Sequence, residues 1–465
     1  MKKAFKSLAI YLISTLTVKS ISILTTPLFT RILSLNEYGI LSIYQTWVNI
    51  FAVFIGLQLS GSIASARIHY KPNEFKSYIK SILGLSSITF IIIVVISFVL
   101  LEHLSIILLI ENTLVPLILI QSFSVYISIF YLTYCIQNKK PKSHLIYSVS
   151  IASFSILLSI IMVMMLEENK YYGKIYGFMT VNILGLIYVY YELYYKIASG
   201  IRLKDWLFAL PISIPLIIHL LSNLVIGQSN RIIITKYLGY EEAAIFSVAY
   251  MIGSFSLMVA EATNNVWSPW YLDNTKKNNT QLIRNVSKQY VIAITVIFGF
   301  IILMSREILA IMAPAIYSTG GSSVVIITVG IFFQYLYRFP LGYEVYTRNM
   351  KWIALATIIS ALLNYYLNII LVQDYHILGA AFSTLVSYIV LFLAHEIIAR
   401  RIIKGYNIPF YTYLPSIITI TLIATLSIYS QEYLFIRAII FVTLLVSAVY
   451  IMMKSYYEIK PLLSR

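Results

Sequence analysis

The stretch LGLSSITFIIIVVISFVLL, residues 83–101, contains no charged side chain. A helix needs about 20 mostly apolar residues to cross the hydrocarbon core of a bilayer, so this stretch predicts a transmembrane helix. Strands of a membrane β-barrel would instead alternate apolar and polar residues. Similar stretches recur along the chain, and we predict fourteen spanning helices at 8–30, 38–62, 79–101, 113–136, 145–166, 173–195, 207–229, 242–265, 288–304, 322–345, 352–372, 377–399, 409–429 and 434–453.

The composition of the chain indicates the same fold class. Of the 465 residues, 60% are hydrophobic and 11% are charged, whereas a soluble protein carries about 25% charged residues. We therefore expect an all-α integral membrane protein. The net charge of +16 does not indicate nucleic-acid binding, because the basic residues stand in small groups between apolar stretches and form no patch.

The distribution of basic residues predicts the topology. If the N-terminus lies in the cytoplasm, alternate segments between the predicted spans are rich in lysine and arginine, which is typical of cytoplasmic loops. These segments hold 25 of the 34 lysines and arginines, and the segments on the other side hold seven. One missed or extra span would invert the alternation. The pattern therefore supports an even number of spans with both termini in the cytoplasm.

A sequence repeat predicts two similar lobes. The sequence RILSLNEYGILSI, residues 31–43, recurs about 205 residues later as KYLGYEEAAIFSV, residues 236–248. Both copies join an odd-numbered span to an even-numbered one, as in a parallel repeat. We predict an N-lobe at 1–200, a C-lobe at 201–405, and two further helices with a cytoplasmic tail at 406–465. Two such lobes around a cleft are the architecture of an alternating-access carrier.

The chain lacks the motifs of several enzyme classes. It contains no Walker A motif and no G-x-S-x-G motif. His395-Glu396 begins an H-E-x-x-H pattern, but Ala399 stands where the second zinc-binding histidine would be. The single cysteine, Cys135, allows neither an internal disulfide nor a cysteine-based metal site. We expect no enzymatic activity, no cofactor and no metal.

Two stretches resemble motifs of a transporter family. The sequence TRILSLNEYGILSIYQ, residues 30–45, follows a first span that contains Pro27. It resembles a hallmark of the polysaccharide-transporter branch of the MOP superfamily, the O-antigen and capsule-unit flippases of the Wzx type. Residues 230–247 resemble the signature of that family's second lobe, where an Asp-Arg pair and an Ile-Tyr-Ser sequence are usual. Here Asn230 replaces the acid and Phe246 the tyrosine.

The resemblance implies a function for the predicted carrier. Members of this family move oligosaccharide units linked to undecaprenyl pyrophosphate from the cytoplasmic to the outer leaflet of the bacterial plasma (inner) membrane. The implied partners are the lipid-linked oligosaccharide, membrane lipids, a polysaccharide polymerase and glycosyltransferases. The resemblance also implies that a proton or sodium gradient drives transport.

An ionisable side chain inside a predicted span is costly, so each one is a candidate functional residue. Lys19 lies near the middle of the first span and shares a helical face with Thr15, Ser22 and Thr26. We expect Lys19 to attract the pyrophosphate or acidic sugars of the substrate. The alternative is a structural ion pair with an internal carboxylate.

The other candidates lie at several depths in the predicted spans. Glu261 is deep in the eighth span, where it is either a carboxylate that binds the coupling ion or the partner of Lys19 or Arg338. Arg31 and Arg231 contact either the pyrophosphate or lipid headgroups, and Arg338 either faces the cleft or reaches the membrane interface. The asparagines of the eleventh span either bind sugar hydroxyls or join neighbouring helices. The candidates for substrate binding, besides Lys19, are Arg31, His219, Asn223, Arg231, Arg338, Asn364 and Asn368.

Three other functions compete with the flippase. MATE-type exporters of cations usually carry an acidic residue in the first span, where this chain has Lys19. A non-transporting scaffold for polysaccharide assembly would use the basic loops, which the topology already explains. A membrane-embedded glycosyltransferase or polymerase would normally carry a sizeable extramembrane loop, and the segments between the predicted spans are short.

Overall fold

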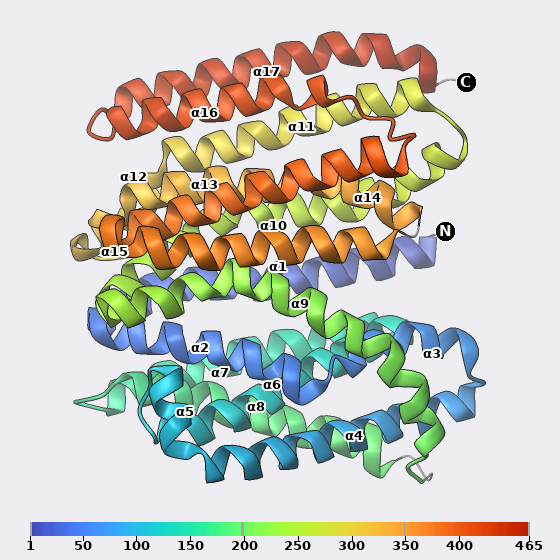
Figure 1. Cartoon of the computed structure of the whole chain (residues 1–465), viewed down its shortest axis with the longest axis vertical. Coiled ribbons are helices and arrows are strands. Elements are labelled where there is room, and N and C mark those ends of the chain that lie inside the picture. Colours follow the sequence, from blue (N-terminus) through green and yellow to red (C-terminus); the bar gives the residue numbers. More distant parts are fainter. Residues whose placement is uncertain (1, 197–199, 348, 464–465) are drawn as a thin grey trace. The chain divides into compact units, whose positions relative to one another are not determined.

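The computed structural model describes residues 2–196, 200–347 and 349–463. These residues form helices and turns without a β-strand, which confirms the predicted all-α class (Figure 1). The α-helices are α1 (Lys2–Ile32), α2 (Leu35–Gly56), α3 (Ile63–His69), α4 (Pro72–Val99), α5 (Leu101–Leu108), α6 (Leu114–Gln137), α7 (Pro141–Met165), α8 (Tyr171–Tyr190), α9 (Leu203–Leu238), α10 (Tyr240–Lys276), α11 (Thr280–Leu303), α12 (Ser305–Met312), α13 (Gly321–Leu336), α14 (Arg338–Tyr346), α15 (Met350–Ile397), α16 (Leu414–Tyr429) and α17 (Leu434–Leu463). Shorter helical turns are η1 (Leu59–Ser62), η2 (Tyr191–Tyr195), η3 (Ala315–Gly320), η4 (Ile398–Ile403) and η5 (Phe410–Thr412).

Each predicted span falls on a helix. Ten stretches of the described residues are long and apolar enough to cross a membrane, and one of them, Lys351–Ile403, contains two predicted spans. The remaining predicted spans lie on α8, α10 and α16. The eleventh and twelfth spans meet at His376, whose φ of 53° and ψ of −138° interrupt the helical backbone of α15. The order of the helices therefore matches the predicted order of the spans.

The two copies of the sequence repeat form similar local structures. Each copy ends one long helix and begins the next, α1 and α2 in the first copy and α9 and α10 in the second. In the first copy Ser34 caps α2, because its hydroxyl accepts a hydrogen bond from the backbone N–H of Glu37 at 3.2 Å. In the second copy Gly239 makes the turn with a φ of 91°, a conformation that costs glycine little.

The chain divides into two compact units. Unit 1 contains Met1–Leu224 and Gly239–Ala244, and unit 2 contains Val225–Leu238 and Ile245–Arg465. Helices α9 and α10 therefore contribute residues to both units. The predicted lobe boundaries at 200 and 405 rest on the sequence repeat and stay a prediction.

In unit 1, α1 packs against α7, α7 against α8, and α2 against α6. The start of α10 also belongs to this unit. Gly39 on α2 lets the backbone of Tyr240 approach so closely that a Cβ at position 39 would lie 2.0 Å from the Tyr240 carbonyl oxygen. The Tyr240 hydroxyl also donates a hydrogen bond to the carbonyl oxygen of Leu109 at 2.6 Å. The two copies of the repeat are thus in contact within unit 1.

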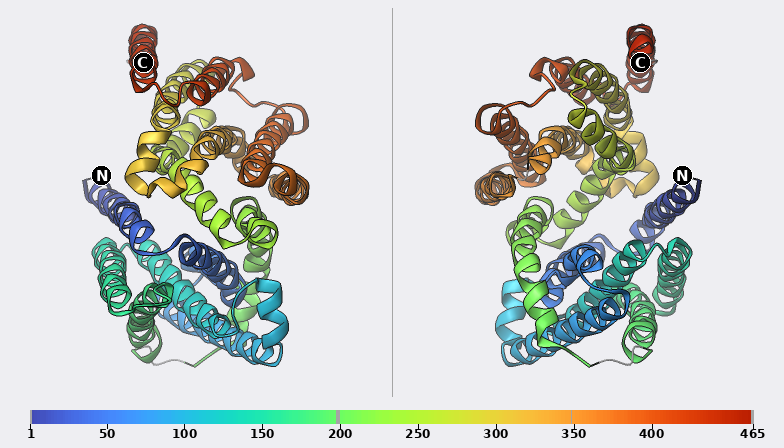
Figure 2. Two further views of the ribbon diagram at one scale, coloured as in Figure 1. Left: turned by 90° about the vertical axis from the view of Figure 1, so that its left-hand side faces the viewer. Right: turned by 90° about the vertical axis from the view of Figure 1, so that its right-hand side faces the viewer.

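In unit 2, α13 packs against α15, and α11 packs against α16 and α17. Figure 2 shows the long helices of each unit nearly end-on, so within a unit they run roughly parallel to one another. Arg437, at the start of α17, is only 1% exposed. Its guanidinium donates to both carboxylate oxygens of Glu307 on α12, each at 2.6 Å, and to the carbonyl oxygen of Leu303 at 2.6 Å. These bonds join α17 to the end of α11 and to α12.

Candidate functional site

Lys19 lies on a polar face of α1 that the rest of unit 1 leaves partly open. On its other side, α1 contacts α7 through Ser14, whose hydroxyl is 3.0 Å from Nδ1 of His144. Lys19 follows Ser14 by five residues, which places it about 140° further around the helix. The Lys19 side chain is half-buried, and Thr15 and Ser22 are exposed. Thr26, the fourth residue of the predicted face, is buried, so the face is open only around Thr15, Lys19 and Ser22. A role of Lys19 in substrate binding stays a prediction.

Of the other candidates of unit 1, Arg31 lies apart from Lys19 along α1. Arg31 is exposed, and its guanidinium donates to the carbonyl oxygen of Pro27 at 2.9 Å. Twelve residues separate Arg31 from Lys19 on the same helix, which is about 18 Å along the axis. Asn223 is half-buried on α9. His219 on α9 has a side chain outside the described residues.

Arg231, on the part of α9 that belongs to unit 2, lies beside an aromatic ring. Its guanidinium donates to the Ser247 hydroxyl at 2.9 Å and to the carbonyl oxygen of Gly227 at 3.3 Å. Its central carbon is 5.2 Å from the centre of the Tyr250 ring, within the range of a cation–π interaction. Arg231 is half-buried, so it holds a delocalised positive charge partly inside the unit.

Tyr250, the ring beside Arg231, contacts a second tyrosine. The hydroxyls of Tyr250 and Tyr388 lie 3.4 Å apart. Arg338, at the start of α14, is half-buried and lies within electrostatic range of Tyr388. We call Arg231, Tyr250, Tyr388 and Arg338 the arginine–tyrosine row. Guanidinium groups bind phosphate oxygens with paired hydrogen bonds, and phenol groups offer hydroxyls and ring faces to sugars.

A buried network of polar side chains joins α9 to α15. The Asn230 amide donates to the Thr384 hydroxyl at 2.8 Å, and the Asn368 amide donates to the Asn230 carbonyl oxygen at 2.6 Å. The Ser229 hydroxyl donates to the Asn364 side-chain oxygen at 3.1 Å. All five side chains are buried. Such contacts are typical of hydrogen bonds between membrane helices. A role of Asn364 and Asn368 in binding sugar stays a prediction.

A second buried cluster contains ionisable groups that the sequence did not single out. Nδ1 of His395 lies 2.7 Å from Oε2 of Glu344, and both side chains are 0% exposed. The next residue, Glu396, is 2.5 Å from the guanidinium of Arg400. Glu344 and Glu396 fall in the last turns of predicted spans, where charged residues are ordinary, and only the folded chain reveals their burial. The side chain of Glu261, predicted to bind the coupling ion, lies outside the described residues.

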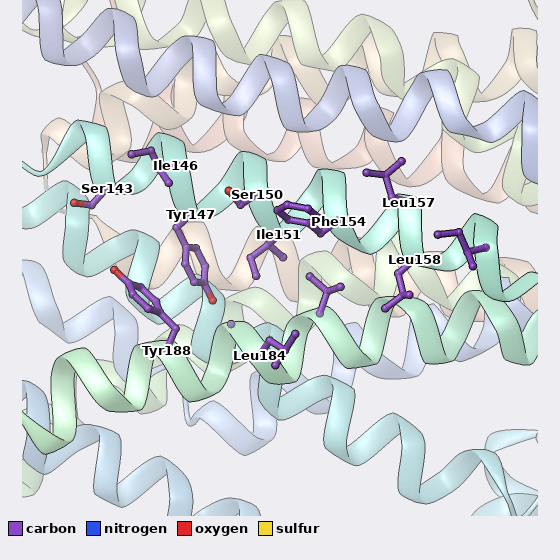
Figure 3. A pocket seen from close by; sticks show the side chains of 13 residues that line it. Ser143, Ile146, Tyr147, Ser150, Ile151, Phe154, Leu157, Leu158, Leu184 and Tyr188 are labelled. Atoms are coloured by element: carbon purple, nitrogen blue, oxygen red, sulfur yellow. The ribbon is translucent and has the colours of Figure 1, made fainter.

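An apolar pocket lies on the surface of unit 1 between α7 and α8 (Figure 3). Its volume is about 770 Å³, and most of its lining is aliphatic or aromatic, as in Ile146, Phe154 and Leu184. Ile146 and Phe154 are largely exposed on what the hydropathy makes a lipid-facing surface. The pocket therefore suits an acyl chain better than a sugar. Among the described residues, no group of three or more His, Cys, Asp or Glu could hold a metal ion.

Comparison with known sequences finds one family. Residues 4–275, more than half of the chain, match the family described as "Polysaccharide biosynthesis protein". A shorter match is to an "Uncharacterized membrane protein" of Haemophilus influenzae, with 41% identity over 59 residues. This match covers 13% of the chain and 15% of the length of that relative.

Comparison with solved structures finds transporters with the same fold. Lipid II flippase MurJ in an inward closed conformation matches with a TM-score of 0.72 and 17% identity, over 96% of this chain and 98% of the other. An outward-facing multidrug resistance MATE family transporter of the MOP superfamily matches with a TM-score of 0.58 and 16% identity, over 85% of this chain and 95% of the other. A MOP superfamily transporter from Pyrococcus furiosus matches with a TM-score of 0.57 and 14% identity, over 86% of this chain and 97% of the other. These similarities confirm the predicted MOP-type transporter fold.

Proposed function

The chain belongs to the polysaccharide biosynthesis protein family, and on this premise we propose that it is a flippase for lipid-linked oligosaccharides. In this proposal it moves undecaprenyl-pyrophosphate-linked repeat units from the cytoplasmic to the outer leaflet of a bacterial plasma membrane by alternating access. The units would supply O-antigen, capsule or another surface polysaccharide. The fold similarity to lipid II flippase MurJ, over nearly the full length of both chains, supports transport of a lipid-linked substrate.

The arginine–tyrosine row is the observation that carries this proposal. Placing two guanidinium groups in membrane helices is costly unless they bind an anion or reach water. Arg231 and Arg338 are both half-buried; Arg231 packs on Tyr250, Tyr250 contacts Tyr388, and the charge of Arg338 acts on Tyr388. A pyrophosphate joined to sugars needs both kinds of group, since cations bind the phosphates and phenols bind hydroxyls and sugar rings.

The first helix favours an anionic substrate over a cationic one. Helix α1 contains no Asp or Glu, and its polar face carries Lys19. A cation exporter would need a carboxylate to bind its substrate or its coupling cation, and α1 offers a cation in that place. The fold similarity to a MATE family transporter does support the exporter as the second candidate, because both classes share this fold.

The proposal includes a location and partners. The alternation of basic loops supports a multi-pass protein of the inner membrane with both termini in the cytoplasm. The substrate would come from glycosyltransferases and pass to a polymerase, and the chain itself would catalyse no covalent step. A scaffold without transport activity would need these same partners, so only a transport measurement separates the two roles.

The proposal is tested with the purified full-length chain in liposomes. Undecaprenyl-pyrophosphate-linked oligosaccharide, extracted from the host, is placed in both leaflets, and a membrane-impermeant enzyme removes sugar from the outer leaflet. The wild type should expose the whole pool, while empty liposomes should protect about half of it. Protection equal to that of empty liposomes would refute the flippase and leave the scaffold.

Substitutions test whether the arginine–tyrosine row binds the substrate. Arg231→Ala and Arg338→Ala should slow the exposure of substrate, because each removes a cation from the row. The matched control is Arg306→Ala, since Arg306 is an exposed arginine on the short helix α12 that donates to the carbonyl oxygen of Gln431. If all three variants are equally fast, the row does not bind the substrate.

A further inference from the structure

Glu344 and His395 form a buried acid–base pair between two helices of unit 2. Glu344 lies on α14 and His395 near the end of α15, and Nδ1 of His395 is 2.7 Å from Oε2 of Glu344. Neither side chain is exposed. The ring of Tyr337, at the junction of α13 and α14, lies 5.2 Å from the His395 ring. The pair is thus buried between α14 and α15, with the Tyr337 ring beside it.

The charges around this pair do not balance without a proton. Glu396 is neutralised by Arg400, which it contacts at 2.5 Å, and Arg400 also donates to the carbonyl oxygen of Ile408. Glu344 faces a histidine, which carries no charge unless it is protonated. If both glutamates are ionised and His395 is neutral, the cluster holds a net charge of about −1. A buried charge without a counter-charge is strongly unfavourable. One bound proton makes the cluster neutral.

Arg338 lies on the same helix as Glu344, six residues or about 9 Å away along the axis, and the remaining titratable groups found around the cluster are uncharged. Those that interact with Glu396 or with its tyrosine neighbours are phenols, which are neutral at ordinary pH. They come from α10, from the segment after η4 and from the end of η5, and they are Tyr271, Tyr406 and Tyr413. The only cation that the structure shows bonded to the cluster is therefore Arg400, among the described residues.

Unused hydrogen-bonding positions mark where the proton binds. Among the described residues, Oε1 of Glu344, Nε2 of His395 and Oε1 of Glu396 are buried and have no hydrogen-bond partner. An ionised carboxylate can only accept, so Nδ1 of His395 carries the hydrogen that it shares with Glu344. Nε2 is then the free basic nitrogen. A proton delivered by hydronium to Nε2 leaves water and creates an imidazolium beside the Glu344 carboxylate.

Basic residues that follow His395 along the chain reach the surface of unit 2. The Arg400 side chain, which contacts Glu396, is 28% exposed, and Arg401 and Lys404 beyond it are exposed. These basic residues belong to a loop that the topology predicts in the cytoplasm. His395 precedes Arg400 by five residues, so the pair lies near the predicted cytoplasmic end of α15.

We propose that Glu344 and His395 form the proton-binding site through which a proton gradient drives transport by this protein. This inference rests on the proposed function. Proton binding stabilises the conformation in which α14 packs against α15, and proton loss leaves a buried charge that favours their separation. A ligand shifts a conformational equilibrium only by such differential stabilisation. Glu344 and Arg338 lie on the same short helix, six residues or about 9 Å apart, so a movement of α14 also moves one end of the arginine–tyrosine row.

Infrared difference spectroscopy tests proton binding without the substrate. Spectra of the full-length protein in lipid are recorded at acid and at alkaline pH. The wild type should show an imidazole band that titrates and a carboxylate band that shifts with it, because the proton binds His395 beside the ionised Glu344. Glu344→Gln and His395→Gln should each remove this coupled change. The matched control is His144→Gln, because His144 is also buried and hydrogen-bonded, with a serine and no carboxylate as its partner.

Either variant suffices if the other fails to fold, since each removes one member of the pair. A wild-type spectrum without a coupled band, or a Glu344→Gln spectrum equal to that of the wild type, overturns the proposal. A purely structural Glu344–His395 bond would change stability and leave no titrating band.

Transport in liposomes then tests the coupling. An imposed pH gradient should accelerate the exposure of lipid-linked oligosaccharide by the wild type and by His144→Gln. Glu344→Gln should transport at the same rate with and without the gradient. If Glu261→Gln loses the gradient response while Glu344→Gln keeps it, the coupling site is at Glu261 and the inference is wrong. If the wild type moves no substrate at all, the proposed function fails, and the infrared result still decides whether the pair binds a proton.

Discussion

The ion pair between Arg437 and Glu307 predicts the effect of removing a single charge. Glu307→Gln keeps the shape of the side chain and removes its negative charge. Arg437 then remains buried, with 2% of its side chain exposed, and loses its only carboxylate among the described contacts. Two hydrogen bonds to a charged group are worth about 1.5–3 kcal/mol each. Glu307 is itself 33% exposed, so solvent reduces this value, and we expect a total loss of about 2–3 kcal/mol.

The assay is thermal unfolding of the full-length protein in detergent, followed by tryptophan fluorescence. The midpoint of Glu307→Gln should fall by about 2–3 °C. Glu192→Gln is the matched control, because Glu192 pairs with Lys196, whose side chain is 50% exposed, and solvent leaves such an exposed pair little effect on stability. Equal midpoints for Glu307→Gln and Glu192→Gln would refute the reasoning that burial of the arginine sets the cost.

The same pair predicts a pH dependence. Partial burial raises the pKa of Glu307, but the hydrogen bonds and charge of Arg437 outweigh it and hold the pKa below its usual value of about 4.5. A carboxyl group with a lowered folded-state pKa contributes stability that is fully present above its unfolded-state pKa. This stability is lost as the pH falls through the folded-state pKa. The difference in midpoint between the wild type and Glu307→Gln should therefore be constant near neutral pH and should shrink below about pH 4.5.

Three further substitutions have expected outcomes. Gly39→Val should lower the yield of folded protein in size-exclusion chromatography, because its Cβ would meet the Tyr240 carbonyl oxygen, whereas a change at Gly200, with open space around it, should not. Asn368→Leu should cost about 1–2 kcal/mol in thermal unfolding, because it leaves the buried carbonyl oxygen of Asn230 without its donor; an unchanged midpoint would contradict this. Lys19→Ala should slow exposure of lipid-linked oligosaccharide in liposomes, and Lys19→Arg should restore it; normal transport by Lys19→Ala would assign Lys19 a structural role.

The helices could be predicted because each spans the membrane as an independent apolar stretch. The predicted spans follow hydropathy alone, and each falls on a helix. The short helices α3, α5 and α12 were outside this prediction, since they are too short to cross a bilayer and arise from the path of the chain between spans. The break at His376 was also placed correctly, because the apolar stretch there is too long for one span.

The candidate site could be predicted only in part, because helical periodicity identifies a polar face but not what the face contacts. It selected Arg231 and Arg338 but not the contact of Arg231 with Tyr250 or that of Tyr250 with Tyr388. The pair Glu344–His395 was missed, since its members are 51 residues apart in the sequence and lie near the ends of two different spans. No local pattern joins such residues. They meet only because α14 packs against α15.

The most direct test of the flippase is to delete the gene in its host and locate the lipid-linked oligosaccharide. The proposal predicts that surface polysaccharide is lost and that the intermediate accumulates in the cytoplasmic leaflet. The wild-type gene should restore both, and the Arg231→Ala gene should not, although its protein reaches the membrane. Normal surface polysaccharide together with increased sensitivity to toxic cations would contradict the proposal and favour the exporter.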